Sequence, residues 1–152
     1  MNLTTPPEVR AAMGIHRPPA EAFDAFIDPS TTKRFWIADS TGHLEAGSTV
    51  TWTMNAAGAE ATVEVRKFDP ANRLMFDWGD KDAMSTEDFR FSQWRDGGCY
   101  VEVTETGFAG NGDELAVHAS DSTGGFTMVL CSLKALLEHN IELDAVTDRL
   151  AE

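Results

Sequence analysis

The chain has 152 residues, which is the usual size of one domain with a single hydrophobic core. Twenty-five acidic residues against twelve basic ones give a formal net charge of -13, and this field repels the phosphates of nucleic acids and of anionic membranes. We therefore expect no nucleic-acid partner and interpret the acidic excess mainly as a solubilising coat. Attraction to a basic partner surface is the alternative.

The chain shows no sign of membrane insertion. No stretch approaches the roughly 20 apolar residues of a membrane-spanning helix, and residues 1–10 lack the cationic and apolar regions of a signal peptide. These features predict a cytoplasmic protein. Cys99 and Cys131 have no CxxC spacing, so we expect two reduced core thiols and neither a disulfide nor a zinc site.

The first third of the chain predicts a strand followed by two short helices. Residues 9–15 form an apolar strand, which ends before a pair of prolines. Apolar side chains at helical spacing predict a helix over residues 19–27. Asp28 is placed to cap a second helix, which begins at Pro29 and reaches Phe35 and Trp36.

The middle of the chain alternates apolar and polar residues with a period of two, which is typical of half-buried strands. Turns rich in Gly, Asn and Asp separate the runs, and a polar loop is expected over residues 79–85. Closely spaced runs of this kind predict an antiparallel meander. Its five strands are expected at residues 49–54, 61–68, 74–78, 87–93 and 99–105.

The last long element is an amphipathic helix that covers the sheet. We expect it to begin at a cap on Asp121 or Ser122 and to end near Leu143. Gly124 and Gly125 near its start each cost roughly 1 kcal/mol relative to Ala. Either another group approaches the helix closely there, or its first turn frays. The apolar stripe consists of Phe126, Val129, Leu130, Leu133, Leu136, Leu137 and Ile141.

These elements predict an α+β helix-grip fold, in which a curved antiparallel sheet wraps around one long C-terminal α-helix, with two short helices after the first strand. We expect a single domain over residues 1–152, with tails at residues 1–7 and 144–152. One straight helix does not fill a strongly curved sheet, so space for a ligand is expected between them. The alternative is that the rings pack against one another and leave no void.

Candidate ligand-binding residues lie on the covered face of this sheet and on the helix. Most are aromatic, and Gln93 and Glu105 are either polar handles for a ligand or positions at the wet rim. The candidates are Trp36, Trp52, Met54, Phe76, Trp78, Phe89, Phe91, Gln93, Glu105, Phe126 and Leu130.

Familiar catalytic motifs are not found in the sequence. It contains no GxSxG, no P-loop, no HExxH and no GxGxxG between a strand and a helix. Glu114 and His118 would lie one turn apart in a helix, but two residues make a weak metal signal. We therefore assign no catalytic residue, no metal ligand and no cofactor from the sequence.

Several segments occur in an order that is known from other proteins. They are residues 17–26, the turn from Asp28 into Trp36, residues 45–47, residues 103–108 and the long terminal helix. In this order the chain resembles the START-like (SRPBCC, birch-pollen-allergen-like) superfamily, and within it the bacterial relatives of the heat-shock protein 90 ATPase activator. The resemblance covers residues 8–143. Gly124–Gly125–Phe126 stands where such families usually carry a Gly–Trp pair.

The resemblance implies a helix-grip fold with an internal cavity, which the superfamily uses for lipids, hydrophobic metabolites, polyketide cyclisation or regulation of a partner protein. Our leading expectation is a binder of a small hydrophobic or amphipathic molecule. A cyclase- or hydrolase-type enzyme with Glu105 or His118 as general base is the first alternative. A module that regulates a chaperone or another protein is the second. The sequence leaves monomer and homodimer open.

Overall fold

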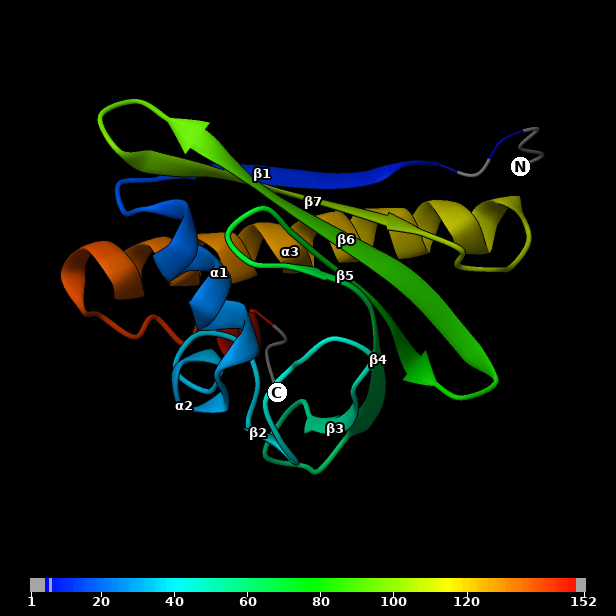
Figure 1. The fold of residues 1–152 in the computed structure, drawn as a ribbon. Helices are drawn as coiled ribbons and strands as arrows, with labels where there is room; N and C mark the ends of the chain where they lie inside the picture. The colour runs from blue at the N-terminus through cyan, green and yellow to red at the C-terminus, as the bar shows by residue number, and fades with distance from the viewer. Residues whose placement is uncertain (1–4, 6, 150–152) are drawn as a thin grey trace.

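The computed structural model describes residue 5 and residues 7–149. The expected tails at residues 1–7 and 144–152 therefore lie partly outside the described residues. Within the described part of the second tail, residues 145–148 form helix α4 (Ala145–Asp148). The confirmed architecture is a curved antiparallel sheet that curls around the long helix α3 (Gly112–His139), with two short helices beside it (Figure 1).

The sheet of the described residues has seven strands, all paired antiparallel, in the order β1-β7-β6-β5-β4-β3-β2. All five strands of the predicted meander are present. The register between residues 60–69 and residues 73–80 shifts between Val65 and Lys67, so this pair of strands has a local irregularity. The strands are β1 (Val9–Ile15), β2 (Asp39–Ser40), β3 (Thr49–Thr53), β4 (Glu60–Asp69), β5 (Arg73–Asp80), β6 (Ala83–Trp94) and β7 (Gly98–Thr106).

The predicted polar loop over residues 79–85 is wrong. The β5–β6 ladder continues to the pair Asp80–Ala83, so only a tight two-residue turn connects the strands. Gly79, with φ of 128°, adopts a backbone conformation that a side chain would oppose. Of the polar residues that suggested a loop, Asp80 ends β5, Lys81 and Asp82 form the turn, and Ser85, on β6, points into the protein and is buried.

The short helices follow β1 as predicted. Helix α1 (Pro19–Ile27) buries the rings of Phe23 and Phe26. Helix α2 (Pro29–Thr32) is capped as expected, because Oδ1 of Asp28 accepts a hydrogen bond of 3.0 Å from the backbone N–H of Ser30. The predicted end of this helix is wrong, because Phe35 and Trp36 lie in the turn that follows Thr32.

Helix α3 begins about three turns earlier than predicted, because its cap is Asn111 and not Asp121 or Ser122, and it ends at His139 instead of Leu143. Its N-cap is Asn111, whose Oδ1 accepts a 2.9 Å hydrogen bond from the backbone N–H of Glu114. The sequence signal failed because the first turns carry few apolar side chains. Asn140, in the left-handed conformation, ends the helix.

The two adjacent glycines lie in the middle of α3 and not at its start. The guanidinium of Arg149, beyond α4, lies over them and donates a hydrogen bond of 3.3 Å to the backbone oxygen of Asp121. A Cβ on Gly124 would lie 2.8 Å from Nη2 of Arg149. Another group therefore approaches the helix closely at these glycines, and the helix does not fray there.

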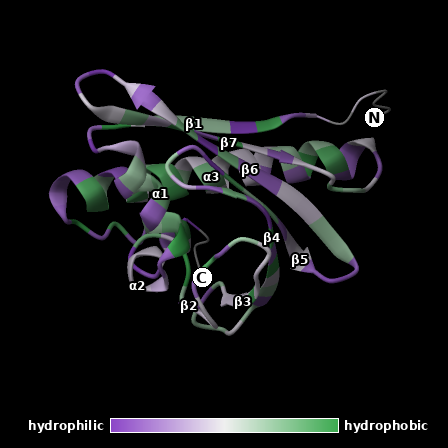
Figure 2. Cartoon of the chain, in the orientation of Figure 1, coloured by the Kyte–Doolittle hydropathy of each residue, from purple (hydrophilic) through white to green (hydrophobic). Residues whose placement is uncertain are grey.

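One core joins the sheet, α1 and α3. Figure 2 shows hydrophobic and hydrophilic segments alternating along α3, while much of the chain in the turns is hydrophilic. Cys99 is buried in this core, and burial raises the pKa of its thiol to about 11, whereas Cys131 is half-buried. Among the described helices, none combines the length and apolar character needed to cross a membrane.

Candidate functional site

An apolar cleft of about 390 Å³ opens between the middle of α3 and the sheet. Its rings come from three separate elements: the turn after α2, strand β5 and helix α3. Helix α4 closes one side with Val146, which also packs against the core. The residues that line the cleft are Trp36, Met54, Trp78, His118, Asp121, Ser122, Gly125, Phe126, Val129 and Val146.

Three aromatic rings form the main wall of this cleft. The ring centroids of Trp36 and Trp78 lie 5.5 Å apart, and Phe126 lies 5.9 Å from Trp36 and 6.0 Å from Trp78. The interplanar angles range from 41° to 73°, so the rings meet edge to face or tilted. Each ring fixes its neighbours, and the wall is therefore preformed.

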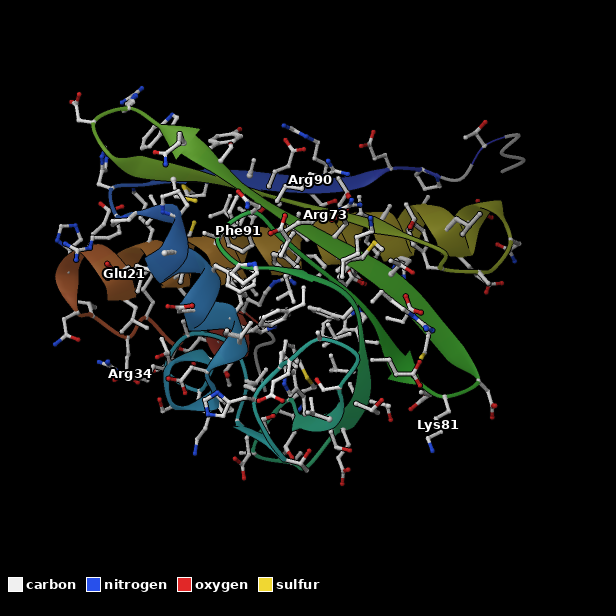
Figure 3. The ribbon with its side chains drawn as sticks, in the orientation of Figure 1. Glu21, Arg34, Arg73, Lys81, Arg90 and Phe91 are labelled. Carbon is white, nitrogen blue, oxygen red and sulfur yellow. The ribbon has the colours of Figure 1, made fainter. Side chains whose placement is uncertain are left out.

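A second hollow of about 230 Å³ continues from this cleft, because Trp36, Met54 and Val146 line both. Its outer side carries the cationic side chains of Lys33 and Arg34. Arg34, labelled in Figure 3, donates a hydrogen bond of 2.9 Å to the side chain of Asn140 and thereby joins the turn after α2 to the segment that follows α3.

The structure brings four of the sequence-predicted candidates together on the cleft: Trp36, Met54, Trp78 and Phe126. Five others are buried in the core behind this wall and line none of the cleft: Trp52, Phe76, Phe89, Phe91 and Leu130. For the four aromatic residues of this group, ring-on-ring packing accounts for their burial, and Leu130 packs in the same hydrophobic core.

The two polar candidates, Gln93 and Glu105, lie in different places. Gln93 is exposed and lines a different hollow beside Pro18 and Pro19. Glu105 is only 2% exposed and is therefore not at a wet rim. It lies directly beneath His118, one of the polar residues of the cleft.

A chain of hydrogen bonds runs from the aromatic wall through the interior to the cleft. Nε1 of Trp78 donates to Oε1 of Glu87 at 2.5 Å, and Oγ of Ser85 lies 3.0 Å from that same oxygen. Oγ of Ser85 also lies 2.9 Å from Oε2 of Glu105. Oε1 of Glu105 lies 2.7 Å from Nε2 of His118. The chain therefore joins β5, β6, β7 and α3.

The protons of this chain can be assigned from its geometry. Ser85 has one hydroxyl hydrogen but contacts two carboxyl groups, so one of the carboxyls must donate to it. Burial, together with the neighbouring Glu105, raises the pKa of Glu87 to about 10. Glu87 is thus neutral and donates a hydrogen bond to Ser85, and the hydroxyl of Ser85 donates a hydrogen bond to Glu105.

Glu105 is the ionised member of the pair. Burial opposes its charge, but hydrogen bonds involving Glu87 and His118 outweigh that cost and lower the pKa of Glu105 below its ordinary value. Oε2 of Glu87 is buried and has no hydrogen-bond partner among the described residues. An unpaired oxygen costs less on a neutral acid than on a carboxylate, which agrees with this assignment.

His118 connects the buried pair to the cleft. Its side chain is 38% exposed, and its ring stacks on Phe108 with centroids 4.2 Å apart and planes 14° apart. Oγ of Ser122, one turn further along α3, lies 3.2 Å from Nε2. The ring is thus held on its face by Phe108 and at one nitrogen by Glu105.

Sequence reasoning missed Ser85 and Glu87 as members of this site. A signal was present, because Glu87 shares a strand face with Phe89 and Phe91, and a carboxyl in an inward position needs a partner. Among residues 5 and 7–149, no group of three His, Cys, Asp or Glu side chains is arranged to hold a metal ion.

The chain matches one protein family over most of its length. A family model described as Activator of Hsp90 ATPase homolog 1-like protein matches residues 16–138. No match was found among the curated proteins.

Solved structures share the fold at low sequence identity. Protein SSP2350 from Staphylococcus saprophyticus is 23% identical with a TM-score of 0.77, over 90% of this chain and 96% of that chain. The Aha1 dimer from Colwellia psychrerythraea is 19% identical with a TM-score of 0.72, over 88% and 97%. CalU16 from Micromonospora echinospora is 18% identical with a TM-score of 0.69, over 93% and 83%.

Proposed function

We propose that this chain, which belongs to the Activator of Hsp90 ATPase homolog 1-like family, binds a small apolar or amphipathic molecule in the cleft between α3 and the sheet. The observation that carries the proposal is the preformed wall of Trp36, Trp78 and Phe126 beside the polar group of His118. Small-molecule sites commonly combine such an apolar lining with a few convergent polar groups.

The size and rigidity of the cleft support this proposal. A volume of about 390 Å³ falls within the range of roughly 300–1,000 Å³ that is common for small-molecule pockets. The wall rings are fixed by one another, so a ligand would not have to order them on binding. A planar ring system would match this wall best, because it can lie against the aromatic faces.

The polar end of the cleft favours an uncharged ligand group. Its lining includes the carboxylate of Asp121 and the imidazole of His118, with the ionised Glu105 directly behind. The whole chain also carries a formal charge of -13. A ligand hydroxyl or carbonyl suits this end, whereas a carboxylate would face repulsion there.

The experiment titrates the protein with 2-naphthol and follows intrinsic Trp fluorescence together with thermal unfolding. Saturable quenching and a raised midpoint of unfolding are expected, because a ligand of the folded state stabilises it. The Met54→Ala variant should weaken binding, whereas Met75→Ala on strand β5 should not, since only Met54 lines the cleft. An unchanged spectrum and midpoint with 2-naphthol, dodecanol and a sterol would argue against the proposal.

Regulation of a partner protein is the second candidate, and the family description favours it. Adding the purified chain to a bacterial Hsp90-type chaperone and measuring ATP hydrolysis tests this role directly. A neighbouring structure is described as a dimer, so homodimerisation is proposed as well and is checked by light scattering of the eluted protein. A stimulated ATPase rate that 2-naphthol does not alter would separate this role from ligand binding.

A further inference from the structure

The buried chain of hydrogen bonds assigns the tautomer of His118. Glu105 is ionised, and a carboxylate can only accept hydrogen bonds. Nε2 of His118 therefore carries the hydrogen that it shares with Oε1 of Glu105, at 2.7 Å. In the neutral ring the free electron pair is then on Nδ1, and no group of residues 5 and 7–149 forms a hydrogen bond with that nitrogen.

The side chains behind His118 hold this arrangement in place. Glu105 is 2% exposed and receives a second hydrogen bond from Ser85, which is itself held by the neutral Glu87. A buried carboxylate beneath an imidazole orients the ring and stabilises the imidazolium that forms when the ring takes up a proton.

We propose that His118 is a general base that removes a proton from a bound amphipathic carbonyl compound, with Glu105 as its positioning residue. This inference rests on the proposed ligand-binding function. Nδ1 takes the proton from the carbon next to the carbonyl. The C–H electron pair forms a carbon–carbon double bond, and the carbonyl π electrons move to oxygen, which gives an enolate.

The imidazolium then returns its proton to the enolate, either to the same carbon or to another carbon of a conjugated system. No oxidant, reductant or co-reactant is consumed, and His118 ends as it began. The class of reaction is thus enolisation or a proton shift. Ser122 lies on the same face of α3, four residues after His118, and its hydroxyl belongs to the same network, 3.2 Å from Nε2 of His118.

Proton shifts suit this site better than hydrolysis does. Hydrolysis needs a nucleophile held beside the base and fixed donors for the oxyanion, and the base must later protonate the leaving group. A proton shift needs only the one basic nitrogen that His118 offers in the cleft.

The test uses 2-tetralone, a bicyclic ketone with one aromatic ring and acidic protons at C1, in heavy water. Proton magnetic resonance follows the loss of the C1 signal, and Trp fluorescence measures binding in the same samples. The wild-type protein should accelerate exchange at least about 100-fold over an equal concentration of free imidazole, with saturation. The His118→Gln variant should bind 2-tetralone but exchange it only at the buffer rate.

Glu105→Gln tests the positioning role. It should lower kcat for exchange about 10- to 100-fold and leave KM within about twofold, because the amide cannot stabilise the imidazolium. The control is His139→Gln, at the exposed end of α3, which should leave exchange unchanged. If His118→Gln does not fold, His118→Asn replaces it.

The outcomes separate the two proposals. Binding of 2-tetralone by the wild type without faster exchange overturns the general-base inference and leaves ligand binding standing. Fast exchange that persists in both His118 variants also overturns it. If the wild type binds neither 2-tetralone nor 2-naphthol, ligand binding fails, and the inference that rests on it fails too.

Discussion

Glu87 of β6 and Glu105 of β7 are direct cross-strand partners, so two carboxyl groups face each other inside the sheet. Two like charges in this position would destabilise the fold. The protein tolerates the pair because Glu87 keeps its proton while Glu105 is ionised and bonded to His118. Folding therefore keeps Glu87 protonated, and the stability of the protein should depend on pH.

Stability should fall as the pH rises from 6 to 9. The pKa of Glu87 is about 10 in the folded protein against 4.5 ordinarily, so its stabilisation is complete below pH 4.5 and is lost as the pH approaches 10. The slope is at most about 1.4 kcal/mol per pH unit. Glu105, whose pKa is lowered, contributes only in the acidic range and does not alter this window.

The Glu87→Gln variant should remove the slope, because an amide does not titrate. Chemical denaturation at four pH values between 6 and 9 measures the free energy of unfolding. Glu45→Gln, at an exposed position, serves as the control and should keep the wild-type slope. Parallel pH profiles for wild type and Glu87→Gln would show that Glu87 is not the protonated group.

Trp78→Phe should lower the free energy of unfolding by about 1–3 kcal/mol, since it removes the indole hydrogen that Trp78 donates to buried Glu87. Denaturation with guanidinium measures the loss. The matched control is Trp94→Phe, whose indole nitrogen donates to no group in the described part of the chain. Equal losses in both variants would contradict a specific role for the bond to Glu87.

Gly14→Ala should destabilise the protein by about 1–3 kcal/mol, because a Cβ at Gly14 would overlap the ring of Trp94. Gly42→Ala is the control: its Cβ would meet only Val50, at an ordinary 3.9 Å. Thermal unfolding distinguishes the two. A Gly14→Ala protein as stable as the control would mean that Trp94 moves aside without cost.

Gly124→Ala should raise the free energy of unfolding by up to about 1 kcal/mol, because Gly is the weaker helix former. The atom that a Cβ would meet belongs to the flexible end of Arg149, which can shift toward solvent. Thermal unfolding measures the gain. A decrease would show that the contact between Arg149 and α3 contributes more than helix propensity does.

The periodicity of the sequence predicted most of the fold, because burial on one face leaves a visible alternation. Strand β3 and the stripe from Phe126 to Leu136 illustrate this, since their inward positions are buried as expected. The start of α3 could not be predicted in the same way. Its signal is the single cap Asn111, and the first turns bury little apolar surface.

The candidate site was predicted only in part for a different reason. Periodicity shows that a ring such as Phe76 faces inward, but not whether it meets another ring or a cleft. Pairing of Glu105 with His118 depends on the placement of α3 over β7, which no local pattern encodes. Glu87 was visible as an inward carboxyl, but the pattern does not identify its hydrogen-bond partners, Trp78 and Ser85.

The most direct test of the central claim is nuclear magnetic resonance of the methionine methyl groups, with ¹³C in the methyl position, during titration with 2-naphthol. Met54 lines the cleft, whereas Met13 and Met75 lie on β1 and β5 and line none of it. Binding in the cleft predicts a saturable shift of the Met54 methyl signal, with Met13 and Met75 unchanged. A Met54 signal that stays in place at saturating 2-naphthol, or equal shifts at all three, would contradict ligand binding in this cleft.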